Sequence, residues 1–166
     1  DLPRWEDSRS ESGFNYRMME LQGAIGLAQL RKLDDVIISQ RSNMLKLANK
    51  ILNLDKVEAR ETPKDSYETA DAFVFFVENK KVAFNCRKKL LQEGISTKIL
   101  PEAMTWHFAG MWDHMDELKL SHGDNLRDSF LNSEKLLNRA VSLPITVKKY
   151  EDEYVNKIVK TIENVL

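Results

Sequence analysis

Two stretches of the sequence hold side chains that could bind a ligand, and the first is a polar pair placed before a helical pattern. Asn15 and Arg17 lie in the run Gly13-Phe14-Asn15-Tyr16-Arg17-Met18. Backbone N–H groups at a helix start, an Asn amide and an Arg guanidinium together suit an anion. Because Asn is also a common N-cap residue, the pattern allows both an anion site and a plain helix start.

The second stretch is an aromatic loop. Trp106, His107, Phe108, Trp112 and His114 fall within a segment that has neither helical nor strand periodicity. Trp and His combine an apolar body with a polar tip, which suits pockets and interfaces. The loop is therefore either part of a ligand pocket or an aromatic lid folded back on the core.

Other kinds of site are not indicated. His107, His114 and His122 are spaced by seven and eight residues, which matches no standard zinc pattern. Cys86 lies on the inward side of a predicted helix, so we interpret it as a small buried residue rather than a nucleophile. The sequence contains no Gly-rich phosphate loop and no Gly-x-Ser-x-Gly elbow. We expect no metal site.

Composition points to one soluble domain. The 166 residues are 42% hydrophobic and carry 25 Lys+Arg against 26 Asp+Glu. A net charge of −1 gives no electrostatic footprint for nucleic acid, and the apolar run Ala72–Val77 is too short to cross a membrane.

A single Cys fits a reducing compartment, so we expect a cytoplasmic protein. Because the chain opens at Asp1, without Met or a signal peptide, we expect a piece of something longer.

Hydrophobic periodicity predicts an α+β or open α/β arrangement, with a small sheet that carries helices on one face. Within the helix Lys80–Glu93, Val82, Ala83, Cys86, Leu90 and Leu91 are expected to face inward, and Gly94 to end the helix. The full predicted order is a helix from Met18, a helix from Asp34 or Asp35 to about Leu52, a weak strand Val57–Arg60, a buried central strand Ala72–Val77, the helix Lys80–Glu93, a strand Ile95–Leu100, a short helix capped by Asn132 or Ser133 and running through Asn138, a strand Ala140–Leu143 closed by Pro144, and a helix Lys149–Leu166.

The first predicted helix contains small residues at Gly23, Ala24, Gly26 and Ala28. Each Gly in a helix interior costs about 1 kcal/mol relative to Ala. Close approach of another backbone would offset that cost. The approaching backbone belongs either to this chain or to a partner helix or second domain.

The same helix carries a family resemblance. The string from Gly13 to Leu30 resembles the segment G-x-N-Y-R-M-x-E-x-Q-A-A-I-G-L-x-Q-L of the DegT/DnrJ family of pyridoxal phosphate-dependent sugar aminotransferases. Lys32-Leu33-Asp34, followed by Arg41, resembles the continuation of that pattern, and Leu143-Pro144-Ile145 resembles the family's S-L-P-L element. The resemblance thus extends from Gly13 to the last helix.

The resemblance implies the C-terminal domain of a fold-type I, aspartate aminotransferase-like enzyme. Residues 1–17 would form an inter-domain segment that reaches the coenzyme site, and residues 18–166 the small domain. In this family the coenzyme lysine lies in a larger N-terminal domain, and no lysine of this chain sits in the required context. The implied partners are that large domain, a second subunit in a homodimer, a sugar and an amino-acid donor.

The family's site residues carry over at a few positions. Asn15 matches the asparagine that reaches across the dimer interface to the phosphate of pyridoxal phosphate, and Arg17 the arginine beside it, which supports the phosphate or an acidic group of the substrate. His107, with Trp106 next to it, matches the histidine of a P-L-H sequence that lines the sugar pocket. No catalytic residue is assigned to this chain. Pro101-Glu102-Ala103-Met104 separates the proline from the histidine, and Pro144–Val147 replaces P-L-H-P, so the sequence departs from the pattern of nucleotide-linked hexose enzymes.

The run from Trp106 to His114 resembles the branch that aminates an 8-oxo form of the octulosonate sugar of lipopolysaccharide, the 8-amino-3,8-dideoxy-manno-octulosonate aminotransferases, with glutamate as the expected donor. Three other interpretations stay open. The chain could belong to an aminotransferase of nucleotide-linked 4-keto or 3-keto hexoses, or act as a non-catalytic module that dimerises or binds a sugar. It could also be a regulatory binding domain that shares the helix by chance.

Overall fold

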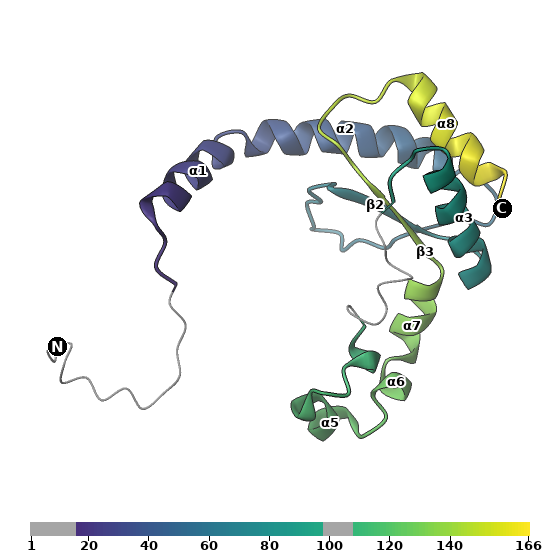
Figure 1. Cartoon of the computed structure of the whole chain (residues 1–166). Coiled ribbons are helices and arrows are strands. Elements are labelled where there is room, and N and C mark those ends of the chain that lie inside the picture. Colours follow the sequence, from purple (N-terminus) through teal and green to yellow (C-terminus); the bar gives the residue numbers. More distant parts are fainter. Residues whose placement is uncertain (1–15, 98–107) are drawn as a thin grey trace, which may run out of the picture. The chain divides into compact units, whose positions relative to one another are not determined.

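A computed structural model describes residues 16–97 and 108–166, and the chain divides into two compact units, Asp1–Asp34 and Asp35–Leu166 (Figure 1). The first unit contains helix α1 (Glu20–Leu30), which begins two residues after the predicted Met18. The N–H of Met19 donates to Oε1 of Gln22 at 3.0 Å. This bond satisfies a backbone donor at the helix start and fixes where α1 begins.

The second unit contains a small sheet and several helices. Helix α2 spans Leu33–Ile51, and all of it from Asp35 onward belongs to this unit. The elements that follow in chain order are β1 (Glu58–Ala59), β2 (Ala72–Phe76), α3 (Lys80–Gln92), the 3-10 turn η1 (Ala109–Met111), α5 (Asp116–His122), α6 (Leu126–Ser129), α7 (Leu131–Asn138), β3 (Ala140–Pro144) and α8 (Asp152–Glu163). None of the helices in the two described ranges is long and apolar enough to span a bilayer.

The described strands form an antiparallel sheet in the order β1-β2-β3, with β2 in the centre. Phe73 pairs with Leu143 and Phe75 with Val141, so these side chains share one face of the sheet. All four are buried. The intervening residues of β2 point to the other face and are only partly buried. The prediction of a central strand is confirmed, whereas burial alternates along it instead of being continuous.

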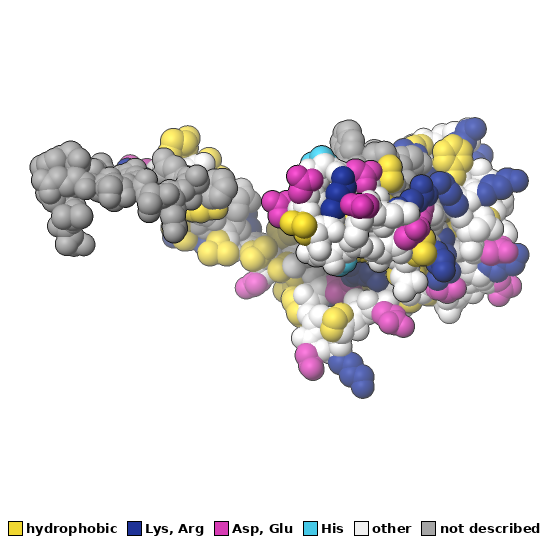
Figure 2. Space-filling model, turned by 90° about the horizontal axis from the view of Figure 1, so that it is seen from below, with side chains coloured by type: hydrophobic (Ala, Val, Ile, Leu, Met, Phe, Trp, Pro, Cys, Tyr) yellow, Lys and Arg dark blue, Asp and Glu magenta, His cyan; other side chains and the backbone are white. Residues whose placement is uncertain are grey.

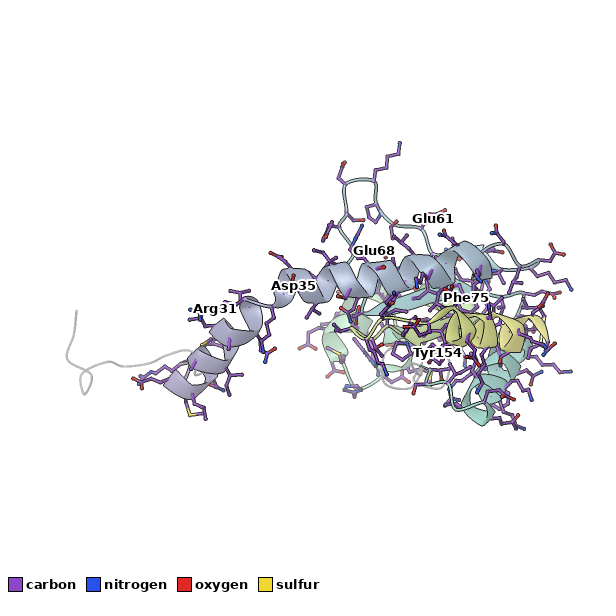
Figure 3. All side chains as sticks on the ribbon, turned by 90° about the horizontal axis from the view of Figure 1, so that it is seen from above. Arg31, Asp35, Glu61, Glu68, Phe75 and Tyr154 are labelled. Atoms are coloured by element: carbon purple, nitrogen blue, oxygen red, sulfur yellow. The ribbon has the colours of Figure 1, made fainter. Side chains whose placement is uncertain are left out.

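Helices α2, α3 and α8 cover the face that carries Phe73 and Phe75. Phe75 is fully buried, and Figure 3 shows it between α2 and α8. The core contains Leu47 and Ile51 of α2, Ala83, Cys86 and Leu90 of α3, and Val155, Ile158 and Ile162 of α8. The predicted fold class, a small sheet with helices on one face, is confirmed, and the antiparallel pairing makes it α+β.

Two predicted helix ends are confirmed. The Asn79 side chain accepts hydrogen bonds from the N–H groups of Lys81 and Val82 at 3.0 and 3.1 Å, which caps the start of α3. Gly94 follows α3 with φ of 73°, a left-handed conformation that glycine adopts without a steric cost.

The structure corrects four details of the sequence prediction. Leu91 is 47% exposed rather than buried, because it lies about 100° around α3 from Leu90. Residues 95–97 are not a strand, although Ile95 is buried, and residues 98–100 lie outside the described ranges. Helix α7 follows Phe130 with no side-chain cap, so neither Asn132 nor Ser133 caps it. Between the predicted strand that ends at Leu100 and the predicted helix capped by Asn132 or Ser133, where we predicted no helix or strand, the structure contains α5 and α6.

Asn43 of α2 fixes the loop that follows β3. Its Nδ2 donates to the carbonyl oxygens of Thr146 and Lys148 at 2.9 and 2.8 Å, and its Oδ1 accepts from the N–H of Tyr150 at 2.9 Å. Asn43 is only 1% exposed, so a residue without these groups would leave buried donors and acceptors unpaired. The polar side chain therefore sets the path of the chain from β3 to α8.

We expect Asn43→Leu, which keeps the size but removes all three hydrogen bonds, to lower the free energy of unfolding by about 3 kcal/mol. Urea denaturation followed by circular dichroism measures the change. Asn49→Leu on the same helix is the control, because Asn49 is exposed, and we expect it to change stability by less than about 0.5 kcal/mol. Equal effects of the two substitutions would contradict the role of Asn43.

Candidate functional site

Arg17 lies directly before α1, where the sequence predicts an anion site. Its side chain is exposed, and the helix begins three residues later at Glu20. A guanidinium presents a planar set of N–H donors that matches a phosphate or a carboxylate. The position and chemistry of Arg17 fit a phosphate contact, and its role stays a prediction.

Asn15, Trp106 and His107 lie outside the described residues, so their predicted roles also stay predictions. The end of the aromatic loop is described, from Phe108 onward, and Phe108 is buried. A Cβ on Gly110 would lie 2.5 Å from a ring carbon of Phe108 and 3.0 Å from the Cα of Arg127. Glycine at this position therefore lets the Phe108 ring pack into the domain and anchors the chain directly after His107.

Phe108 lines a cavity of about 570 Å³ on the sheet face opposite to α2, α3 and α8. Its apolar wall combines the sheet, the aromatic loop and α7. The lining residues are Arg60, Val74, Phe76, Phe108, Ala109, Phe130, Ser133, Leu136, Leu137 and Ala140. The prediction of Ala72–Val77 as one continuously buried strand missed this cavity, because the run is apolar throughout and its sequence does not distinguish the two faces of the strand.

Two arginines supply positive charge near this cavity. Arg60 lines it and is hydrogen-bonded to Glu68. The guanidinium of Arg139 lies 5.4 Å from the centre of the Phe76 ring and donates to Glu58. That hydrogen bond lowers the pKa of the Glu58 carboxyl, with a smaller contribution from the charge of Arg139. The cavity thus has an apolar interior and paired charges beside it.

The loop that carries Glu68 is tied to α2 (Figure 3). Arg41 of α2 donates from Nη1 to the carbonyl oxygen of Glu68 at 2.8 Å, and its guanidinium lies 4.2 Å from the centre of the Tyr67 ring. Arg41 belongs to the part of the sequence that resembles the family pattern. In the structure it holds the Glu68 backbone, and Glu68 in turn pairs with Arg60 of the cavity.

A second pocket, of about 360 Å³, lies between the loop after β3 and the start of α8. The rings of Tyr150 and Tyr154 meet edge to face there, with centroids 5.2 Å apart. Burial of the phenol raises the pKa of Tyr154, and the neighbouring Tyr150 adds to the shift. The remaining lining residues are Thr146, Lys148, Lys149 and Glu151. No sequence motif indicated this pocket.

Two of the three histidines are described. His114 is exposed, and the His122 ring packs 4.9 Å from the Phe130 ring, centroid to centroid. Within residues 16–97 and 108–166, no three His, Cys, Asp or Glu side chains are grouped as a metal ion would require. His107 lies outside those ranges.

Pyridoxal phosphate, which the resemblance implies, needs a lysine for covalent attachment and donors for its phosphate. No lysine side chain in the part of the chain that the structure describes is buried, so none of these fits an enclosed attachment site. Arg17 fits the phosphate by its chemistry. The described residues therefore fit a supporting contact to the phosphate and do not fit the attachment of the coenzyme.

Cys86 is fully buried on the inward side of α3, as predicted. Burial raises the pKa of its thiol to about 11, because the charged thiolate loses its hydration. At neutral pH the group is a protonated thiol packed among apolar side chains. This environment supports the interpretation of Cys86 as a core residue.

We expect iodoacetamide to modify Cys86 in the folded protein at pH 8 at least 100-fold more slowly than in urea, because the buried thiol is protonated and shielded. Mass spectrometry of the Cys86 peptide measures the rate.

The unfolded thiol ionises at lower pH than the folded one, so this group's contribution to stability should be lost as pH rises above about 9. The Cys86→Ala variant should lack that part of the pH dependence. Equally fast labelling in the folded and unfolded states would contradict the assignment.

The model of the DegT/DnrJ/EryC1/StrS aminotransferase family matches residues 3–163 of the chain. Solved structures share its fold. They include the sugar aminotransferase CalS13 from Micromonospora echinospora, with 20% sequence identity and a TM-score of 0.65 over 92% of this chain and 37% of that one. PseC from Helicobacter pylori, an aminotransferase of pseudoaminic acid biosynthesis, has 16% identity and a TM-score of 0.67 over 99% of this chain and 42% of that one.

The same fold occurs in a protein with a different reaction. The GDP-4-keto-6-deoxy-D-mannose-3-dehydratase of E. coli, solved with bound hydrated PLP, matches with 18% identity and a TM-score of 0.63 over 90% of this chain and 36% of that one. In all three comparisons this chain spans about two fifths of the solved chain or less.

Proposed function

The chain belongs to the DegT/DnrJ/EryC1/StrS aminotransferase family, and we propose that it forms the C-terminal part of a pyridoxal phosphate-dependent sugar aminotransferase. The observation that carries this proposal is the family match over residues 3–163, which takes in the Asn-Tyr-Arg segment, α1 and the whole sheet. In this proposal residues 1–17 reach the coenzyme site and residues 18–166 form the small domain. The large, lysine-bearing domain precedes them in a cytoplasmic homodimer.

Pyridoxal phosphate, when bound, carries an amino group from an amino acid to a keto or aldehyde sugar. We assign supporting roles to residues of this chain. Asn15 and Arg17 bind the phosphate through an amide and a guanidinium, and Trp106 and His107 line the sugar pocket. Phe108, directly after His107, is packed in the domain and fixes the position at which that segment ends.

The Trp106–His114 run supports a specific substrate, an 8-oxo octulosonate of lipopolysaccharide synthesis, with L-glutamate as the donor. A nucleotide-linked keto hexose is the second candidate. It is favoured by one observation: the E. coli relative of the same fold is a GDP-4-keto-6-deoxy-D-mannose enzyme. The two candidates differ in size and charge, because the hexose carries a nucleoside diphosphate and the octulosonate carries a carboxylate.

We expect Arg17→Gln in the complete gene product to weaken binding of pyridoxal phosphate by about 10-fold or more, because a charge-assisted hydrogen bond to the phosphate is lost. Asn15→Ala should weaken it in the same direction. Titration of the coenzyme absorbance gives the dissociation constants. Arg31→Gln is the matched control, since Arg31 is an exposed arginine at the other end of α1. Unchanged coenzyme affinity in both site variants would remove the phosphate role.

We expect the complete gene product, given L-glutamate, to convert an 8-oxo octulosonate to the 8-amino sugar, with 2-oxoglutarate as the second product. Mass spectrometry of the sugar and an enzymatic assay of 2-oxoglutarate measure the two products. A dTDP- or GDP-linked 4-keto hexose is tested in parallel. Turnover of the nucleotide sugar alone would replace the proposed substrate, and turnover of neither would reject both substrates.

A further inference from the structure

We propose that the outer face of α3 binds peripherally to an anionic lipid surface. This face consists of Lys81, Phe84, Lys88 and Leu91, which lie opposite to the residues of α3 that enter the core. All four belong to the second unit. None of them has a role in the reaction that we propose for the complete gene product, so the two proposals can be tested separately.

The outer face follows from the helical period of α3. At 100° per residue, its four positions fall within an arc of about 80°. The residues of α3 that enter the core lie on the other side of the helix. Lys81 and Lys88 are exposed, and Phe84 and Leu91 are 49% and 47% exposed. The helix therefore presents two cations and two large apolar groups on one side, outside the core.

Positive charge is concentrated on α3. The helix contains five Lys and Arg residues and no Asp or Glu, in a chain whose net charge is −1. Lys89, beside the outer face, forms an ion pair of 3.4 Å with Glu93. Within residues 16–97 and 108–166, neither Lys81 nor Lys88 takes part in an ion pair. The two cations of the outer face are thus available to an anionic partner.

The right-hand end of the second unit, where Figure 1 places α3, shows the same mixture of side chains. Figure 2 shows Lys and Arg side chains gathered at this end, with hydrophobic side chains among them. The surface there combines positive charge with apolar contact area.

Phe84 and Leu91 supply the apolar part of the outer face. They are seven residues apart, which places them about 10 Å from one another along the helix axis. Phe84 follows Lys81 by three residues and precedes Lys88 by four, so a cation stands beside it on each side along the helix. Large apolar groups exposed to water gain free energy when they are transferred to an apolar medium. Lys combined with Phe and Leu on one helix is typical of helices that lie in the head-group region of a membrane.

A lipid surface suits this face better than other anionic partners do. Neither the cavity at Phe108 nor the pocket at Tyr154 is lined by a residue of α3, whereas a bound peptide commonly lies in a groove. Lys is a compact, flexible point charge, which suits the diffuse negative charge of head groups. A nucleic acid is disfavoured because the chain has no excess of basic residues. Since the other side of α3 is in the core, the helix would lie on the lipid surface and not cross it.

Vesicle sedimentation with the complete gene product tests the proposal. One set of vesicles contains phosphatidylcholine with about one third phosphatidylglycerol, and the other contains phosphatidylcholine alone. We expect the protein to sediment with the anionic vesicles and to stay in solution with the neutral ones. Raising NaCl from about 50 to about 500 mM should release most of the bound protein, because salt screens the attraction. No sedimentation with the anionic vesicles would overturn the proposal.

Charge reversal tests whether the outer face is the part that binds. The double variant Lys81→Glu and Lys88→Glu should lower the partition coefficient to anionic vesicles by about 10-fold or more, because attraction becomes repulsion. Lys64→Glu with Lys148→Glu is the matched control, since it makes the same change in net charge at two exposed lysines of loops. We expect a decrease of less than about threefold from it. Equal decreases in the two double variants would contradict a specific role of α3.

The apolar pair is tested by a second double variant. Phe84→Ser with Leu91→Ser should lower the partition coefficient by about fivefold or more, because the apolar contact with the lipid is lost. Leu120→Ser is the control, since Leu120 is 88% exposed on α5. Circular dichroism of each variant verifies that it is folded. An unchanged partition coefficient in the Phe84 and Leu91 variant would overturn the proposal.

An acidic protein segment is the alternative partner, and a poly-glutamate peptide serves as its probe. Fluorescence anisotropy of the labelled peptide measures binding to the complete gene product. Binding of the peptide that is lost in the Lys81 and Lys88 variant, without binding to anionic vesicles, would reject the lipid surface and assign the outer face to an acidic protein. Binding to anionic vesicles by a protein that performs no transamination would support this proposal and reject the proposed activity.

Discussion

The alternation of side chains along β2 is the constraint on which the second unit depends. Phe73 and Phe75 point into the core beneath α2, α3 and α8, while Val74 and Phe76 point to the other face and line the larger cavity. Because β2 is the central strand, its register with β3 sets both faces at once. A shift of one residue would exchange core and cavity side chains, so the same pairing that stabilises the fold also builds the candidate ligand face.

Polar contacts over long sequence distances hold the loops around this sheet. Asn43 satisfies three backbone groups of the segment that joins β3 to α8, and Arg41 holds the backbone of the loop before β2. Both residues come from α2, which therefore serves as a rigid frame for two loops far apart in the chain. Glu68, on one of these loops, in turn pairs with Arg60 at the cavity.

The two units differ in how they use apolar residues. The second unit buries its apolar side chains around one core, whereas α1 buries none of its own. In the part of the chain that the structure describes no lysine is buried, and Arg17 is exposed and has the donor chemistry of the phosphate contact that we propose for it.

The family and most helices could be predicted without the structure, the family from the Gly13–Leu30 string and the helices from hydrophobic periodicity and local end signals such as Gly94. It also predicted that Cys86 is buried. Local patterns did not reveal that Leu91 is exposed, that α5 and α6 form, or that β2 has a second face. Those features depend on which surfaces meet in three dimensions: Gly110 is required by the Phe108 ring and the Arg127 backbone, and Asn43 by a loop about 100 residues away, contacts that only the tertiary structure brings together.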